Sequence, residues 1–181
     1  MTMTKLHLGC GKRFIEGFHH IDVLDFPHVD HRGPVDDLSF IPDETVELIY
    51  ACHVLEHFGR NEVQAVLLEW RRVLRPSGIL RLAVPDYAAC AGLYCAGKLS
   101  SLRLICGSMV GGQRDEYDYH KMIFDEPLLA ELLLEAGFRE ARRWDWRQVE
   151  HGHVDDYSQA YLPHMDKENG TLISLNMEGV R

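Results

Sequence analysis

The chain has 181 residues and a formal net charge of −9 at pH 7. This length suits one domain spanning residues 1–181, and the acidic balance argues against non-specific binding to nucleic acids, which requires a basic surface. The five cysteines are odd in number, and we find no long apolar run or signal-peptide pattern. We therefore expect a cytoplasmic protein with reduced cysteines and no membrane span.

Short apolar segments recur along the chain and predict strands. They are rich in residues that favour strands, and the fourth is apolar almost throughout, as in a strand buried on both faces. Two weaker segments near residues 141–146 and 172–177 complete the set. The four clear segments are residues 6–10, 20–23, 46–52 and 79–84.

Two helices are predicted between these strands. The first begins at Asn61, with Gln64 three residues later as in a capping box, and ends at the Arg-Pro-Ser-Gly turn at 75–78. The second begins at Asp125 and ends at Gly137.

Strands that alternate with helices imply a mostly parallel sheet with helices on both faces, an α/β fold. Such sheets bind ligands beyond the carboxyl ends of their strands. The residues placed there by the predicted strands are Gly9, Cys10, Gly11, Asp22, Asp37, Leu38, His53, Pro85 and Asp86.

Gly9 and Gly11 bracket a tight turn that would let a ligand approach the backbone, although a purely structural turn is an equal alternative. An acidic residue at the next strand end, Asp22, is typical of a ribose ligand. Asp37 would accept from the amino group of an adenine with Leu38 against the ring, unless Asp37 is simply solvated. There is no G-x-G-x-x-G, and only ten residues separate Gly11 from Asp22. This short loop favours a nucleoside without a pyrophosphate.

The segment HVLEH at 53–57 has the H-x-x-E-H pattern of inverted zinc proteases. Such proteases need this motif inside a long helix. Here a predicted strand runs to Cys52, and Gly59 soon follows, so about one turn is available. We therefore place the motif at the sheet edge and regard a metal hydrolase as the weaker alternative.

Several segments together resemble the class I S-adenosylmethionine-dependent methyltransferases, and most closely their small type 11 branch, found among bacterial surface-polysaccharide genes. The resemblance covers nearly the whole chain. It implies a Rossmann-like sheet of seven strands whose last strand, near 172–178, is antiparallel, and here a shortened first helix. The segments are LHLGCGKRFIEGFHHID, DDLSFIPDETVELIYACHVLEHF, EWRRVLRPSGILRLAVPD, YDYHKMIFD, LLLEAGF and ISLNMEG.

The resemblance also implies S-adenosylmethionine as cofactor and a set of contacts to it. The glycine turn, including Cys10, would approach the methionine and ribose parts, Asp22 would hold the ribose, and Asp37 and Leu38 would contact adenine. Cys52 and His53 would lie beside the cofactor.

Small-RNA 2′-O-methyltransferases and ubiquinone-pathway O-methyltransferases resemble the chain at HVLEH, where they hold a divalent metal with E-x-x-E-H. The corresponding ligands would be His53, Glu56 and His57, with His120 as a fourth. A histidine in place of the first glutamate favours zinc over magnesium. The alternative is that Glu56 caps backbone amides while His57 packs.

We therefore expect methyl transfer to an oxygen of a sugar, glycan precursor or other small molecule, with His53, His57 or His120 as the base. Residues 86–118 are expected to form a lid or substrate cap, or else a packing subdomain. A non-catalytic S-adenosylmethionine-binding or scaffold protein is the rival from another class, and the sequence leaves a homo-oligomer open.

Overall fold

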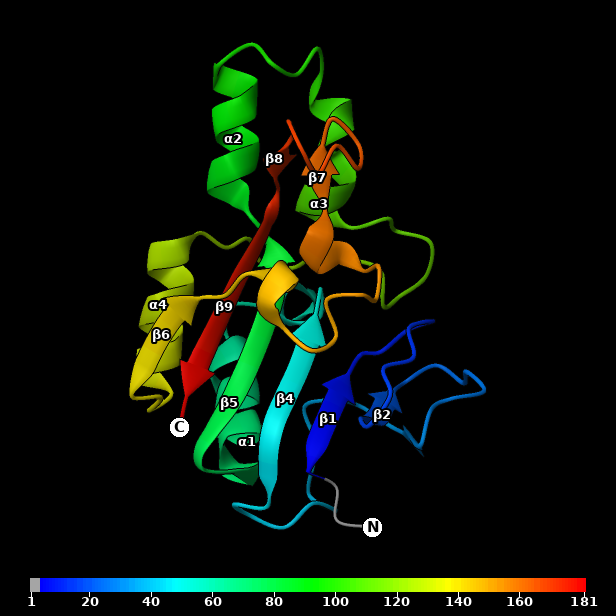
Figure 1. Ribbon diagram of the computed structural model, residues 1–181, viewed down its shortest axis with the longest axis vertical. Helices are drawn as coiled ribbons and strands as arrows, with labels where there is room; N and C mark the ends of the chain where they lie inside the picture. Colours follow the sequence, from blue (N-terminus) through cyan, green and yellow to red (C-terminus); the bar gives the residue numbers. More distant parts are fainter. Residues whose placement is uncertain (1–3) are drawn as a thin grey trace.

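The computed structural model of the protein describes residues 4–181. Its main sheet has seven strands in the order β3-β2-β1-β4-β5-β9-β6 (Figure 1). The first five run parallel to one another, and β9 lies antiparallel between β5 and β6. The predicted sheet, with its antiparallel last strand, is confirmed. The strands are β1 (Lys5–Leu8), β2 (His19–Asp22), β3 (His31–Arg32), β4 (Val46–Cys52), β5 (Leu74–Pro85), β6 (Glu140–Arg143) and β9 (Ser174–Val180).

The central strand β4 is apolar on both faces, which explains why the sequence reads as one continuous hydrophobic run. Ile49 and Ala51 pack into the main core, whereas Leu48 and Tyr50 join a smaller cluster with Ile15 and Phe18. The sheet therefore buries apolar surface on both sides.

The two faces are covered unequally. Helices α1 (Val63–Val73) and α4 (Glu126–Glu135) pack on one face, where they lie behind the sheet in Figure 1. The opposite face carries loops and the short 3-10 helices η3 (Trp146–Gln148) and η4 (Tyr157–Gln159). The helices expected on both faces are thus present on one face, and on the other loops and 3-10 turns take their place. No helix among the described residues is both long and apolar enough to cross a membrane.

The first crossover has no helix, where the resemblance implies a shortened one, because only ten residues connect β1 to β2. Residues 9–18 connect β1 to β2 through turns alone. The predicted start of the second helix at Asp125 is confirmed, and this residue is the N-cap of α4, because its side chain accepts from the Leu128 amide at 3.0 Å.

Three local predictions are wrong. The first helix begins at Val63 rather than Asn61, because the Glu62 carboxylate accepts from the Gly59 amide at 2.6 Å and fixes the turn before it. The Arg-Pro-Ser-Gly segment is the irregular start of β5, with the turn taken at Ser77, whose φ is 64°. Trp146 lies in η3 because Asp145 accepts from the Arg147 amide and starts a 3-10 turn.

The last of the predicted strands is divided. Residues Thr171–Leu172 form β8, which pairs with β7 (Tyr161–Leu162) in a separate two-stranded sheet. The main-sheet strand β9 begins only at Ser174.

Residues 86–118 extend beyond the carboxyl end of the sheet (Figure 1). They carry α2 (Tyr87–Cys95), η2 (Leu102–Leu104) and α3 (Cys106–Val110). Cys90, Leu93, Leu99 and Ile105 form a small core of their own with Ile173 from the end of the chain. This segment therefore has a small hydrophobic core of its own.

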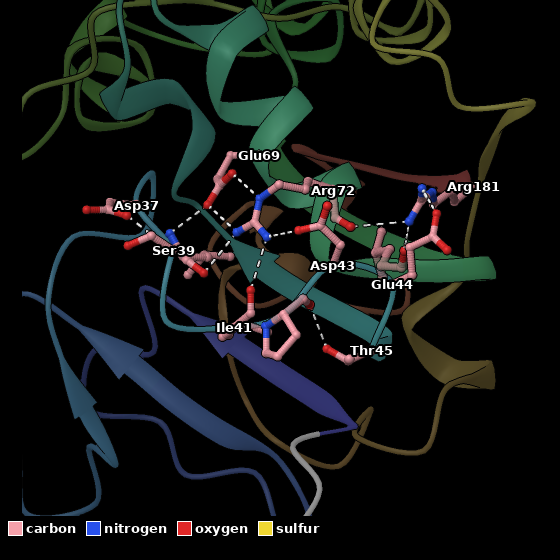
Figure 2. A network of polar contacts seen from close by, with 12 residues as sticks. Asp37, Ser39, Ile41, Asp43, Glu44, Thr45, Glu69, Arg72 and Arg181 are labelled. Carbon is pink, nitrogen blue, oxygen red and sulfur yellow. Dashed lines mark hydrogen bonds and ion pairs between the residues drawn. The ribbon is translucent and has the colours of Figure 1, made fainter.

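Arg72 of α1 fastens the segment that leads into β4 (Figure 2). Its guanidinium donates to the carbonyl oxygens of Leu38 and Ile41, both at 3.0 Å, to Glu69 at 2.7 Å and to Asp43 at 2.5 Å. Glu69 in turn accepts from the Leu38 amide at 2.9 Å. One side chain thus holds residues 38–43 against the helix.

Replacing Arg72 by Met should lower the free energy of unfolding by about 2 kcal/mol, because two carbonyls and two carboxylates lose a charged donor. Arg75→Met is the matched control, since its guanidinium forms one ion pair with Glu47 at 3.2 Å and its side chain is 56% exposed. Urea denaturation should give a loss of at most about 1 kcal/mol for the control. Equal losses in the two variants would contradict the role given to Arg72.

Candidate functional site

The carboxyl ends of β1 and β2 meet at the glycine turn. Gly9 and Gly11 both have positive φ, 59° and 53°. Asp22, at the end of β2, accepts from the Gly11 amide and from the Leu24 amide, both at 2.8 Å. The carboxylate therefore shapes the turn whatever else it binds.

The two glycines are needed for different reasons. A Cβ on Gly9 would lie 2.5 Å from a methyl carbon of Val54, so any side chain there collides with the segment that follows β4. A Cβ on Gly11 would meet nothing within 4 Å. The turn is thus packed against Val54 at Gly9, whereas no protein atom lies close to the Cβ position of Gly11. A ligand could therefore approach the backbone at Gly11.

Two thiols belong to these strand ends, Cys10 within the glycine turn and Cys52 as the last residue of β4. Burial, reinforced by the nearby Asp22, raises the pKa of Cys10 to about 12. Burial and the charge of Asp156 raise the pKa of Cys52 well above its ordinary value. Both raised pKa values favour the neutral thiol over the thiolate.

The segment after β3 presents Asp37 but not the Leu38 side chain. Asp37 is exposed, and its pKa is lowered by the Ser39 side chain and by the Ser39 amide, which donates to the carboxylate at 3.0 Å. Leu38 is fully buried in the main core. The predicted packing of the Leu38 side chain against adenine does not fit this structure, because the side chain lies in the core.

His53 follows β4 directly and has a φ of 55°, a conformation that few residues other than glycine adopt. Its amide donates to the Ala83 carbonyl at 2.7 Å. Its Nδ1 lies 3.2 Å from Glu56 Oε1, and its Nε2 lies 3.5 Å from the Ser174 hydroxyl. The Tyr157 ring lies 5.2 Å away, centroid to centroid. The imidazole is thus held between a carboxylate and a hydroxyl.

HVLEH forms only one short turn, η1 (Leu55–His57), immediately after β4. The long helix that an inverted zinc protease requires is therefore absent at this motif, as the sequence predicts. Glu56 nevertheless contacts histidines from two sides, since His120 Nε2 lies 3.9 Å from Glu56 Oε1.

Among the described residues, Glu56, His57 and His120 form one group whose ligand atoms all lie within 4.8 Å of one another. His53 is not a member of it. The loop that carries His120 is fixed to η1, because the Lys121 and Met122 amides donate to the Glu56 carbonyl at 2.8 and 3.2 Å. Burial acts to raise the pKa of Glu56, but the neighbouring His53 and His57 together lower it below its ordinary value. Burial lowers the pKa of His120.

Comparisons with known proteins agree on one fold. A family model described as a methyltransferase domain, of type 11, matches residues 18–82. The search of curated proteins finds no match. The solved structure of a S-adenosylmethionine-dependent methyltransferase from Archaeoglobus fulgidus is similar with a TM-score of 0.59 and 12% identity, covering 98% of this chain and 86% of that chain. The chain has the class I methyltransferase fold.

Two further solved methyltransferase structures are similar to this chain. A methyltransferase from Mesorhizobium loti is similar with a TM-score of 0.56 and 12% identity, over 99% of this chain and 91% of that chain. The 1,6-didemethyltoxoflavin-N1-methyltransferase from Burkholderia thailandensis, solved with its acceptor and S-adenosylhomocysteine, has a TM-score of 0.57 and 16% identity, over 98% of this chain and 70% of that chain. The class I resemblance is confirmed.

Some neighbours of the site in this class I fold are not apparent from the sequence. Ser174 begins β9, and its hydroxyl donates to the Asn176 amide oxygen at 2.9 Å. Asp156 accepts from the Tyr50 hydroxyl at 2.7 Å and brings Tyr157 beside His53. Both Asp156 and Tyr157 lie in the polar segment 151–170, whose sequence is typical of a loop. Only the unusual length of this segment indicates that it could contribute to a site.

Proposed function

We propose that the protein transfers the methyl group of S-adenosylmethionine to an oxygen of a small molecule, such as a sugar or glycan precursor. The observation that carries this proposal is the glycine turn, open at Gly11 and fixed by Asp22 at the carboxyl edge of a class I sheet. The reaction is an in-line displacement, for which alignment of the two reactants supplies much of the acceleration.

In this proposal the cofactor lies along the edge of β1, β2 and β4. The backbone at Gly11 faces its methionine and ribose parts, and the carboxylate of Asp22 accepts from the ribose hydroxyls with its remaining lone pairs. Asp37, whose charged form the Ser39 side chain and amide favour, accepts from the adenine amino group. Cys10 and Cys52 supply neutral lining.

The acceptor would bind between this edge and the cap of residues 86–118. A small molecule is favoured because the Burkholderia thailandensis relative takes one. An oxygen is favoured because the His53 imidazole lies at the edge with Glu56 beside Nδ1, an arrangement that leaves Nε2 to accept a proton.

Two rival functions can be distinguished from the proposed one by experiment. A metal hydrolase built on HVLEH is disfavoured because this motif forms only the short turn η1 (Leu55–His57) and no long helix. A scaffold that binds the cofactor without turnover would bind S-adenosylhomocysteine and transfer no label. Incubation with methyl-labelled S-adenosylmethionine and a metabolite extract separates these cases.

A cytoplasmic location is part of the proposal. All five cysteines are free, and Cys95 and Cys106 are exposed, which suits a reducing compartment.

Gly11→Ala should weaken S-adenosylhomocysteine binding by about 1–3 kcal/mol, because its methyl group would occupy the space assigned to the ligand. The fold should lose only about 1 kcal/mol from the left-handed backbone, since nothing in the protein lies within 4 Å of that Cβ. Calorimetry with S-adenosylhomocysteine, together with a thermal melt, measures both. Unchanged affinity in the folded variant would remove the cofactor from this turn.

A further inference from the structure

Glu56 is a fully buried carboxylate for which the protein supplies no aligned donor. Its exposed fraction is 0%, and neither side-chain oxygen has a hydrogen-bond partner among the described residues. The His53 Nδ1 lies 3.2 Å from Oε1, close enough for an ion pair but without the alignment of a hydrogen bond. A buried carboxylate without donors is costly, so its position calls for a cationic partner.

Two imidazoles are oriented toward this carboxylate with their tautomers fixed. His57 Nδ1 lies 3.1 Å from the Tyr119 carbonyl oxygen, and His120 Nδ1 lies 3.0 Å from the Ser108 carbonyl oxygen. A carbonyl can only accept, so each Nδ1 carries the proton and each Nε2 keeps its lone pair. Histidines that ligate metals usually donate their other ring nitrogen to such a carbonyl.

We propose that Glu56, His57 and His120 bind one divalent ion of the zinc type. A carboxylate and two imidazoles make a ligand set that suits zinc and neighbouring transition metals better than magnesium or calcium. The ligand atoms lie within 4.8 Å of one another. Zn–N distances of about 2.0–2.1 Å imply ligand atoms about 3.3 Å apart in a tetrahedral site, so binding draws the three side chains together around the ion.

Three protein ligands leave a coordination position for water or for a hydroxyl, whose pKa the ion would lower. Holding the acceptor hydroxyl in this way rests on the proposed function. Binding of the ion does not, because it depends only on the three side chains and their carbonyl partners.

The test uses the full chain without an affinity tag, with zinc alone as the titrant. Competition against a chromophoric chelator should give one zinc per chain. His57→Ala and Glu56→Gln should weaken binding by 100-fold or more, the loss expected when one of three ligands is removed. His164→Ala is the control, because this histidine is exposed and lies outside the group, and it should leave the affinity unchanged.

Cobalt in place of zinc distinguishes this site from the thiols. Tetrahedral nitrogen and oxygen ligation gives d–d bands without thiolate charge transfer, and this spectrum should disappear in Glu56→Gln, whose fold is checked by circular dichroism. Equal zinc affinity in the protein and in folded Glu56→Gln, or a thiolate spectrum, would overturn the proposal. Zinc binding without S-adenosylhomocysteine binding would leave the metal site standing and reject the proposed function.

Discussion

Acidification from pH 7.5 to 4.5 is expected to destabilise the protein by about 3 kcal/mol through His7 alone. The side chain is 2% exposed on β1, and its Nδ1 has no hydrogen-bond partner among the residues described. Burial, followed by the nearby His20, His151 and His28, lowers the pKa of His7 to about 3.

The sign follows from where the proton binds. An unfolded histidine takes up its proton below about pH 6.5, whereas folded His7 stays neutral until about pH 3. The unfolded state therefore binds more protons between these values, and stability falls as the pH drops through that range. His151 acts in the same direction, because burial and the charge of Arg81 lower its pKa to about 4.

His7→Phe isolates this contribution. Phenylalanine has a similar shape and can take the place of the ring between His20 and Tyr50, each 5.4 Å away. Urea denaturation at pH 7.5 and 4.5 should give a stability difference between protein and variant that changes by about 3 kcal/mol. His153→Phe, at an exposed position, serves as the control. A parallel loss of stability in protein and His7→Phe would assign the acid sensitivity to other groups.

The strands could be predicted because each carries its own signal. β4 matches the predicted segment at both ends, since a run buried on both faces reads as apolar throughout. The start of α4 at Asp125 was predictable for a similarly local reason, since its side chain caps the helix. At Asn61 a competing carboxylate one residue later determines the turn, and propensity alone does not decide between two such candidates.

The site was predictable where it depends on strand ends and not where it depends on packing. HVLEH belongs at the sheet edge because β4 ends at Cys52. The burial of Leu38 follows from the way Arg72 draws residues 38–43 onto α1 (Figure 2), which no local pattern reveals. The approach of His120 to Glu56 depends on a loop that returns from the cap to η1.

The covering of the second face of the sheet also could not be predicted from local sequence patterns. Residues 144–160 are polar and contain little regular structure, yet they take the place of the helices that would cover this face. Trp144 donates to the Leu82 carbonyl at 2.8 Å, and the His151 ring lies 4.2 Å from that of Tyr50. Single aromatic contacts rather than a periodic stripe hold the segment down, so the sequence gives no helical or strand signal.

Replacing His53 by Asn should lower the rate of methyl transfer by roughly 10²–10⁴-fold, the usual contribution of one general base. Asparagine suits the test because it tolerates the positive φ of 55° at this position and cannot accept the proton. The loss should fall on kcat rather than on KM, since a base acts in the transition state. Affinity for S-adenosylhomocysteine should change only slightly in comparison.

Transfer of label from methyl-labelled S-adenosylmethionine to the acceptor measures this rate, with the exposed His153→Asn as control. Zinc affinity of His53→Asn should match that of the unaltered protein, because His53 lies outside the group of Glu56, His57 and His120. If the variant keeps its affinity for zinc and for S-adenosylhomocysteine but loses turnover, His53 is the base that accepts the proton of the acceptor hydroxyl. Full turnover in that variant would instead assign the base to His57 or His120. These histidines lie near the same Glu56 carboxylate that contacts His53.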